Sequence, residues 1–210
     1  MRKWRQKYYD LFSVIYDRFV ALHSSDKQGD LRAYLAEKTE VTRGDRVLDI
    51  CTGTGSVLRH FRQRVREQGM VVGLDFSIGM LKVATRKIAD LENVYVLQAE
   101  AGGLPFKAGV FHAVTCSHAF YELKGESQDR CLQEVVRVLT PSGAFYMMEH
   151  DIPKSVVIRM LYYIRLLSMG ASKAIEILKH EKAYLGLYFK TVTTIRPPRG
   201  LSKIMICKNQ

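Results

Sequence analysis

Residues 47–55 read VLDICTGTG, a strand-like run that passes directly into a glycine turn. Apolar residues dominate up to Ile50, and a helical pattern opens at Ser56. A strand that enters a helix through glycines is typical of a parallel α/β sheet, with the turn at the carboxyl end of the strand. Gly53 and Gly55 have no Cβ, so a ligand can lie against bare backbone near the unpaired first amides of the helix. The stretch therefore predicts a site for a small, polar, nucleotide-like ligand.

The turn lacks the marks of two common nucleotide-binding loops. A dinucleotide fingerprint has a third glycine three residues after the second, and this chain has Leu58 there. The lysine of a phosphate-binding P-loop is also missing. The missing glycine argues against a nicotinamide-dependent reductase, and the missing lysine argues against a P-loop nucleotide site. A tight turn without a ligand stays open as the alternative for this stretch alone.

Acidic residues follow the next two expected strands. The run 70–75 (MVVGLD) ends on Asp75, twenty residues after Gly55, where a carboxylate can accept hydrogen bonds from two vicinal ribose hydroxyls. Glu100 follows the expected strand 94–97 and can accept from an exocyclic adenine amine. A lone glutamate there is usually a solvated loop acid, but its place at a third consecutive strand end favours the site.

The remaining pattern completes an alternating α/β chain. The expected elements are a helix capped by Ser77 and continuing through Ile88, a strand over 112–117, a helix over 128–139, a turn over 141–143, a strand over 144–149, and a closing antiparallel pair over 191–195 and 202–207. Five alternating units and a hairpin predict a Rossmann-like, doubly wound, mostly parallel sheet with helices on both faces.

No linker, repeat or low-complexity block divides the 210 residues, so one domain is expected. Its expected parts are N-terminal helices over 1–42, a cofactor-binding core over 43–150, a helical lid or substrate region over 151–190, and the closing hairpin over 191–210. Aromatic residues at helical spacing predict the first helices, and the pairs Tyr9-Asp10 and Tyr16-Asp17 are placed to form a lid over the glycine turn.

The chain is strongly basic, with a net charge of +11. Such an excess suits an anionic partner, which includes nucleic acid, an anionic membrane surface or an acidic substrate; a merely solvated basic surface is the alternative. The four cysteines show no metal-binding spacing, so no metal site is expected, and they indicate reduced thiols of a cytoplasmic protein. No signal peptide is apparent.

The stretch 155–188 is expected to be helical and is rich in apolar residues. Its most apolar part, 156–169, is too short to span a bilayer and is interrupted by Arg159 and Arg165. Two interpretations stay open: the stretch is part of the core, or it forms an apolar lid whose arginines bind anionic headgroups at a membrane surface. A lid would indicate an apolar acceptor such as a prenylated quinone precursor or a phospholipid amine.

Four motifs, in this order and spacing, give the chain a family resemblance: VLDICTGTG, VVGLDFSIGML, QAEAGGLPF and VVRVLTPSGAFYMMEH. From about Tyr9 to Glu149 the chain resembles the class I S-adenosylmethionine-dependent methyltransferases, within them the ubiquinone/menaquinone-biosynthesis C-methyltransferases. The resemblance implies S-adenosylmethionine as cofactor and a seven-stranded sheet whose last strand is antiparallel. It also implies that Asp49, Gly53 and Gly55 cradle the methionine part, and that Asp75 holds the ribose hydroxyls.

By the same resemblance Glu100 and Ala101 face the adenine, although Asp or Asn is commoner than Glu at the first position. Cys51 stands where many relatives have glycine. The other residues that the resemblance assigns to the cofactor site are Thr52, Phe76, Met80 and Ser117, together with Cys51 itself.

The methyl group of a sulfonium is already a strong electrophile, so the protein mainly has to align a nucleophile and exclude water. A base is needed only if the nucleophile loses a proton. The candidates above the carboxyl edge of the sheet are His118 first, then Tyr121 and His150.

Several other functions stay as alternatives. Enzymes that methylate nucleobase amines carry an Asn/Asp-Pro-Pro-aromatic motif after the fourth strand, where this chain has residues 117–120 (SHAF). Enzymes that methylate cytosine at C5 need a nucleophilic cysteine, typically after a proline, and this chain has no Pro-Cys pair. Nucleic acid is therefore supported only by the charge. A phospholipid amine N-methyltransferase and a non-catalytic module that only binds S-adenosylmethionine complete the alternatives.

Overall fold

The computed structural model describes residues 10, 30–123, 126–151, 160, 180–198 and 202–209. The strands are β1 (Arg46–Ile50), β2 (Met70–Asp75), β3 (Val94–Gln98), β4 (Phe111–Ser117), β5 (Leu139–His150), β6 (Thr191–Ile195) and β7 (Ser202–Lys208). The helices whose full length lies in these ranges are α2 (Asp30–Lys38), α3 (Leu58–Val65), α4 (Ile78–Lys87), the 3-10 turn η1 (Phe120–Glu122) and α5 (Glu126–Val138).

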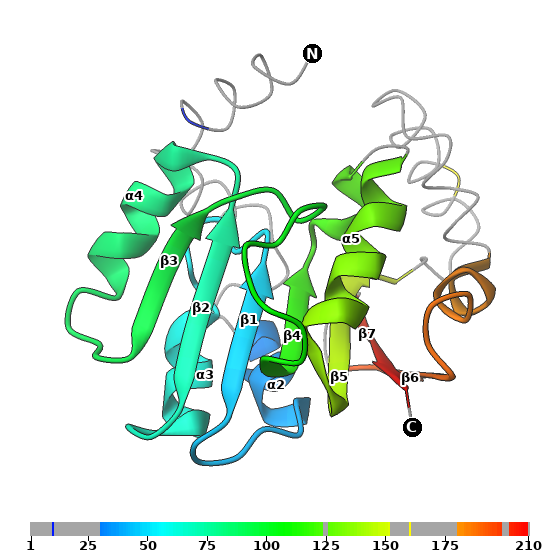
Figure 1. Cartoon of the computed structure of the whole chain (residues 1–210), viewed down its shortest axis with the longest axis horizontal. Helices are drawn as coiled ribbons and strands as arrows, with labels where there is room; N and C mark the ends of the chain where they lie inside the picture. Colours follow the sequence, from blue (N-terminus) through cyan, green and yellow to red (C-terminus); the bar gives the residue numbers. More distant parts are fainter. Residues whose placement is uncertain are drawn as a thin grey trace.

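The seven strands form one sheet in the order β3-β2-β1-β4-β5-β7-β6 (Figure 1). The strands β1 to β5 pair in parallel, and β7 runs antiparallel between β5 and β6. The predicted Rossmann-like sheet with an antiparallel last strand is thus confirmed. The strand order reverses between β1 and β4, which is where an open α/β sheet forms a crevice for a ligand.

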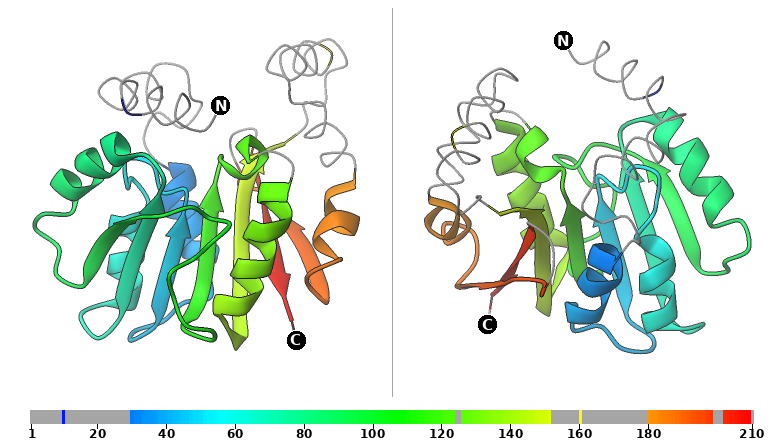
Figure 2. Two further views of the ribbon diagram at one scale, coloured as in Figure 1. Left: turned by 45° about the horizontal axis from the view of Figure 1, so that its top comes forward. Right: turned by 180° about the vertical axis from the view of Figure 1, so that it is seen from behind.

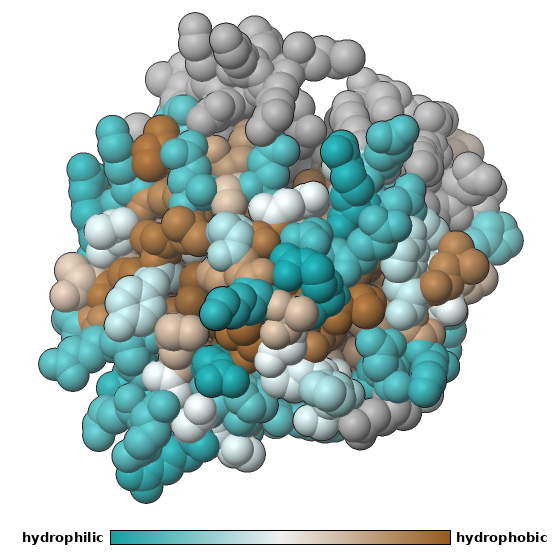
Figure 3. Space-filling model, viewed as in Figure 1, coloured by the Kyte–Doolittle hydropathy of each residue, from teal (hydrophilic) through white to brown (hydrophobic). Residues whose placement is uncertain are grey.

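Two core clusters fill the two faces of the sheet. Helices α2 and α3 lie on one face of the sheet, and α5 lies on the other (Figure 2). The first two place Leu35 and Phe61 in one cluster, and α5 places Leu132 in the other. The α5 face is covered unevenly, because the connection from β3 to β4 contains no helix. Tyr95 and Leu97 on β3 consequently stay partly exposed, and apolar side chains are visible over β2 and β3 (Figure 3).

Most boundaries agree with the sequence pattern to within two residues, and Ser77 caps α4 as expected by accepting from the Met80 amide. The turn predicted over 141–143 is wrong, because β5 runs through it. Its register on β4 shifts between Phe111 and Ala113. A Cβ on Gly143 would lie 3.0 Å from the carbonyl oxygens of Phe111 and His112. Because glycine has no side chain, the backbone can pack closely against β4 here and continue as a strand instead of turning.

Several expectations fall on residues outside the described ranges. These are the helices over 1–22 except Asp10, the aromatic-acid pair 16–17, and most of the stretch 155–188. Within the described residues, 180–185 are helical, and no helix is both long and apolar enough to cross a membrane.

Gly69 lies where α3 and the start of β2 pack closely together, so a substitution there tests this packing. A Cβ there would lie 2.4 Å from the Val65 Cβ and 2.6 Å from the Asp45 carbonyl oxygen. We expect Gly69→Ala to lower the free energy of unfolding by about 1–3 kcal/mol through overpacking. Gly103→Ala is the matched control, because its Cβ would meet nothing within 4 Å. Equal urea midpoints for the two variants would contradict the packing described here.

Candidate cofactor site

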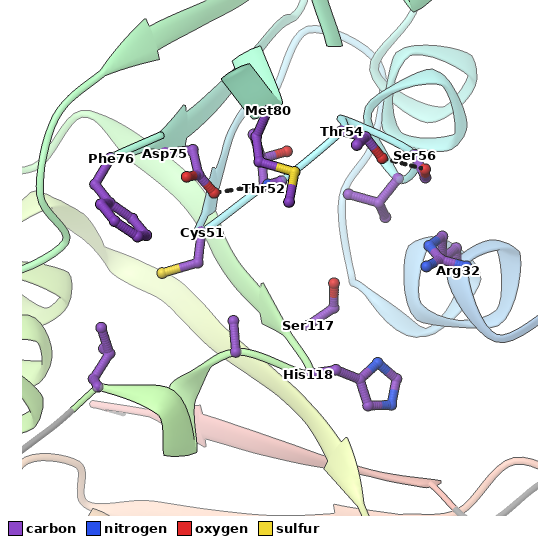
Figure 4. A pocket seen from close by; sticks show the side chains of 14 residues that line it. Arg32, Cys51, Thr52, Thr54, Ser56, Asp75, Phe76, Met80, Ser117 and His118 are labelled. Carbon is purple, nitrogen blue, oxygen red and sulfur yellow. Dashed lines mark hydrogen bonds between the residues drawn. The ribbon is translucent and has the colours of Figure 1, made fainter. Parts of the chain in front are cut away.

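A pocket opens at the carboxyl edge of the sheet where the strand order reverses (Figure 4). Its walls come from the turn after β1, the end of β2, the start of α4, the end of β4 and helix α2. The lining residues are Arg32, Cys51, Thr52, Gly53, Thr54, Ser56, Val57, Asp75, Phe76, Met80, Ser117, His118, Ala119 and Leu123. Seven of the residues predicted to bind the cofactor are therefore brought together: Cys51, Thr52, Gly53, Asp75, Phe76, Met80 and Ser117.

The two glycines of the turn have different roles. A Cβ on Gly53 would meet nothing within 4 Å, so this backbone is open to a ligand. A Cβ on Gly55 would lie 2.9 Å from the Ala84 Cβ, and Gly55 does not line the pocket. Gly55 therefore makes room for α4, and its predicted contact with the methionine part of the cofactor stays a prediction.

Cys51 adopts a backbone φ of +55°, a left-handed conformation that favours glycine. This conformation is one that suits the glycine which the family resemblance leads us to expect at this position. The Cys51 side chain is half-buried and points into the pocket region beside Asp75 and Phe76 (Figure 4).

Asp75 ties the turn to the start of α4. Its Oδ2 accepts from the Gly53 amide at 2.9 Å, and its Oδ1 accepts from the Ser77 amide at 2.9 Å. Burial raises the pKa of Asp75, and these amide hydrogen bonds oppose the rise. A carboxylate offers about four acceptor positions, so Asp75 can hold the turn and still accept from a ribose hydroxyl.

Asp10 is the only described residue of the N-terminal segment, and it contacts the same corner. Its Oδ1 accepts from the Ser77 hydroxyl at 2.6 Å and from the Gly79 amide at 2.8 Å. A carboxylate at the first turn of a helix is favoured by the helix dipole. The chain before α2 therefore approaches the pocket at the start of α4, while the rest of the expected lid lies outside the described residues.

Asp49 is buried at 1% exposure beneath the turn. Its Oδ1 accepts from the Thr115 hydroxyl at 2.6 Å, and its Oδ2 has no hydrogen-bond partner in the described part of the chain. Burial raises the pKa of this carboxyl to about 6. A buried carboxylate oxygen without a partner is costly, so this position favours a cationic ligand nearby.

Glu100 and Ala101 do not line the pocket. The Glu100 side chain is exposed, whereas Ala101 is 6% exposed and belongs to the α5-side core cluster. Their predicted contact with adenine stays a prediction.

His118 is the one predicted catalytic residue that lines the pocket. It follows β4 with a φ of +52°, and its ring Nε2 lies 3.1 Å from the Ser202 hydroxyl. The His150 ring lies 4.5 Å away, centroid to centroid. Burial, and then the charges of His150 and Arg32, lower the pKa of His118 to about 3, so its imidazole is neutral near pH 7.

Tyr121 and His150 lie outside the pocket lining. The Tyr121 hydroxyl is buried and has no hydrogen-bond partner in the described ranges, and the ring contacts the α5-side core. His150 is exposed at the end of β5, and its ring contacts that of His118, which lines the pocket.

Sequence reasoning missed several lining residues, above all Arg32, Thr54 and Ser56. The two hydroxyl residues were visible as part of the glycine turn. Arg32 had no local signal, because only the packing of α2 against α3 brings it to the pocket.

A family model described as the ubiE/COQ5 methyltransferase family matches residues 3–175. The chain belongs to this family. It is 31% identical over 163 residues to a demethylmenaquinone methyltransferase of Shouchella clausii, covering 75% of this chain and 68% of the relative. It is 34% identical to a ubiquinone/menaquinone biosynthesis C-methyltransferase of Idiomarina loihiensis, where it covers 62% of this chain but only about half, 53%, of the relative.

Among solved structures, a SAM-dependent methyltransferase from Aquifex aeolicus has the same fold, with a TM-score of 0.60 and 18% identity over 86% of this chain and 92% of that one. The ubiE/COQ5 membership confirms the predicted family resemblance and makes the chain a methyltransferase with S-adenosylmethionine as methyl donor. The pocket fits that donor, because open backbone at Gly53 and two buried carboxylates suit a cationic nucleoside. The roles of individual residues remain predictions.

The raised pKa of Asp49 predicts a pH-dependent stability. An acid whose pKa is raised on folding stabilises the fold below its unfolded value near 3.8, and this contribution is lost as the pH rises through about 6. We therefore expect Asp49→Asn to gain about 2 kcal/mol of unfolding free energy relative to the wild type between pH 4 and pH 7.5. Urea unfolding without donor at both pH values measures the change, and a constant difference between the two proteins would contradict it.

Proposed function

We propose that this chain transfers a methyl group from S-adenosylmethionine to a ring carbon of a reduced quinone precursor. The observation that carries the proposal is the family match over residues 3–175. It is supported by relatives named for demethylmenaquinone methylation and for ubiquinone/menaquinone biosynthesis. The same names favour carbon over the amine of a phospholipid or a base of RNA as the methyl acceptor.

We place the donor along the pocket with its ribose hydroxyls at Asp75. Its methionine part then lies over the open backbone of Gly53, toward Arg32. The ionised Asp49 beneath the turn favours the positive sulfonium and ammonium groups of the donor. Binding of that charge lowers the cost of burying Asp49, so the donor stabilises the fold as it binds.

The acceptor is proposed to react as a hydroquinone. Its hydroxyl group loses a proton, the electron-rich ring carbon attacks the methyl group, and a carbon–carbon bond forms as the carbon–sulfur bond breaks. The ring carbon then loses its own hydrogen as a proton, the phenolate oxygen takes up a proton again, and S-adenosylhomocysteine leaves, so one proton is released for each methyl group transferred. An oxidised quinone lacks the ring electrons for this attack.

His118 is proposed to accept the hydrogen bond of the acceptor hydroxyl at the end of β4. A pKa near 3 makes it a weak base on its own, but a neutral imidazole accepts hydrogen bonds well. Ser202 of β7 orients the His118 ring through its hydrogen bond to Nε2. The exposed His150 ring, 4.5 Å from the His118 ring between centroids, can pass the proton of the acceptor hydroxyl to solvent. Tyr121 is not assigned a step, because it lies outside the pocket lining.

The proposed organisation of the chain keeps residues 43–150 as cofactor core and residues 151–190 as the part that meets an apolar acceptor. A cytoplasmic protein that touches a membrane surface through its basic side chains fits the net charge of +11 and a membrane-borne acceptor.

The redox state of the acceptor tests the reaction directly. Purified protein is incubated with methyl-labelled S-adenosylmethionine and a short-chain demethylmenaquinone, either oxidised or reduced with dithionite. We expect label in the organic phase only with the reduced form, because only the hydroquinone ring is nucleophilic. Transfer to RNA or to a phospholipid amine, with none to the reduced quinone, would overturn the proposed acceptor.

His118→Asn tests the proposed catalytic contact, because asparagine tolerates the positive φ at this position. We expect kcat with the reduced acceptor to fall about 100-fold or more, while the Kd for S-adenosylmethionine changes less than about threefold. His180→Asn, at an exposed position, is the control. A kcat within about threefold of the wild type would remove His118 from the mechanism.

A further inference from the structure

The chain leaves β4 through a short loop that brings His118 to the pocket wall. His118 has a backbone φ of +52°, a left-handed conformation that is strained for a residue with a side chain. Its neighbour Ala119 also lines the pocket, and the 3-10 turn η1 begins directly afterwards at Phe120. Such a conformation persists only where surrounding contacts hold it, so the contacts of this loop decide where the imidazole lies.

The end of β5 supplies three contacts to the loop from successive residues. The Met148 carbonyl oxygen accepts from the His118 amide at 2.7 Å. The Glu149 Oε1 accepts from the Phe120 amide at 2.8 Å, and the His150 ring contacts the His118 ring. One strand end therefore holds the loop on both sides of Ala119.

The start of β7 lies beside this strand end. Lys203 pairs with Glu149 in the antiparallel register, and Ser202 precedes it. Successive residues of a strand point to opposite faces of the sheet. Ser202 therefore binds the His118 ring on one face. Glu149 binds the Phe120 amide on the other face, so the imidazole and the backbone that carries it are fixed from two sides.

Glu149 is the charged member of this set, and its side chain is buried at 3% exposure. A buried carboxylate is costly unless hydrogen bonds and a nearby cation offset the loss of water. Its cross-strand neighbour Lys203 is buried as well and forms an ion pair with the buried Glu181. Buried ionic groups often add little stability over apolar side chains of similar size. The hydrogen bond to the Phe120 amide is the contribution of Glu149 that an apolar side chain could not make.

We propose that Glu149 is a positioning residue for methyl transfer. Its carboxylate fixes the Phe120 amide, and the two backbone units between Phe120 and His118 pass this constraint on, so that the imidazole is held at the pocket wall. The inference rests on the proposed role of His118, so its test includes a measurement that needs no acceptor.

Three variants of Glu149 separate the hydrogen bond from the charge. Glu149→Leu removes the acceptor oxygen, Glu149→Asp keeps the charge on a shorter side chain, and Glu149→Gln keeps an acceptor oxygen at the same length without the charge. We expect kcat with the reduced acceptor to fall about 30-fold or more for Leu and Asp, and to stay within about threefold of the wild type for Gln. The Kd for S-adenosylmethionine, measured by calorimetry, should change less than about threefold in all three.

Glu92→Leu is the control, because Glu92 is an exposed acid in the turn before β3, and its kcat should equal that of the wild type. A kcat kept by Glu149→Asp but lost by Glu149→Gln would mean that the charge acts, and would overturn the inference. Equal losses in all three variants, which a purely structural role predicts, or an unchanged kcat in Glu149→Leu would also overturn it. If Glu149→Leu does not fold, the Asp and Gln variants give the same contrast.

A double-mutant cycle tests whether Glu149 acts through His118. In the His118→Asn background, Glu149→Leu should lower kcat further by less than about threefold, because the group that it positions is already gone. A full additional loss would place the action of Glu149 elsewhere and contradict the inference.

NMR of ring-labelled histidine follows His118 without an acceptor. In protein saturated with S-adenosylhomocysteine, the His118 ring signals are those that disappear in His118→Asn. They should shift in Glu149→Leu and Glu149→Asp and stay in place in Glu149→Gln. Unshifted signals in Glu149→Leu would overturn the inference. The expected shifts in a protein that methylates no quinone would support the positioning role and contradict only the proposed acceptor.

Discussion

The Asp75 carboxylate is the point on which the cofactor site depends. One of its oxygens accepts from the Gly53 amide and the other from the Ser77 amide, so one side chain joins the turn after β1 to the start of α4. It thereby fixes the open backbone that faces the ligand and the start of the helix beside it. Because β1 and β2 are adjacent in parallel register, the sheet itself delivers these groups to one edge.

Acidic and basic side chains lie at different ends of the site. Burial raises the pKa values of Asp49 and Asp75 at the same pocket, and one Asp49 oxygen has no partner among the described residues. Arg32 lies at the opposite end. This arrangement suits a ligand that is cationic at its sulfur and anionic at its carboxylate, and binding of such a ligand stabilises the fold. The methyl donor of the ubiE/COQ5 family has this charge pattern.

The fold could be predicted from the sequence because its signals are local. Short-range patterns in the sequence mark the strand ends at Ile50 and Asp75 and the helix cap at Ser77. The parallel pairing of β1 with β2 then brings these residues together. The role of Gly55 could not be predicted in this way, because it depends on how closely α4 crosses the turn. The predicted turn before Ala144 failed for the same reason: a tertiary contact at Gly143 outweighs its turn residues.

The same distinction between local signals and tertiary contacts applies to the catalytic candidates. The place of His118 directly after β4 correctly predicted that it lies at the pocket. Its positive φ, its Ser202 partner and its lowered pKa could not be predicted, because they come from tertiary contacts. The most direct test of the whole account is a crystal structure with S-adenosylhomocysteine. The account predicts ribose hydroxyls on the Asp75 carboxylate and the methionine part over Gly53, toward Arg32. A ligand bound in the reverse direction, or away from Gly53, would contradict it.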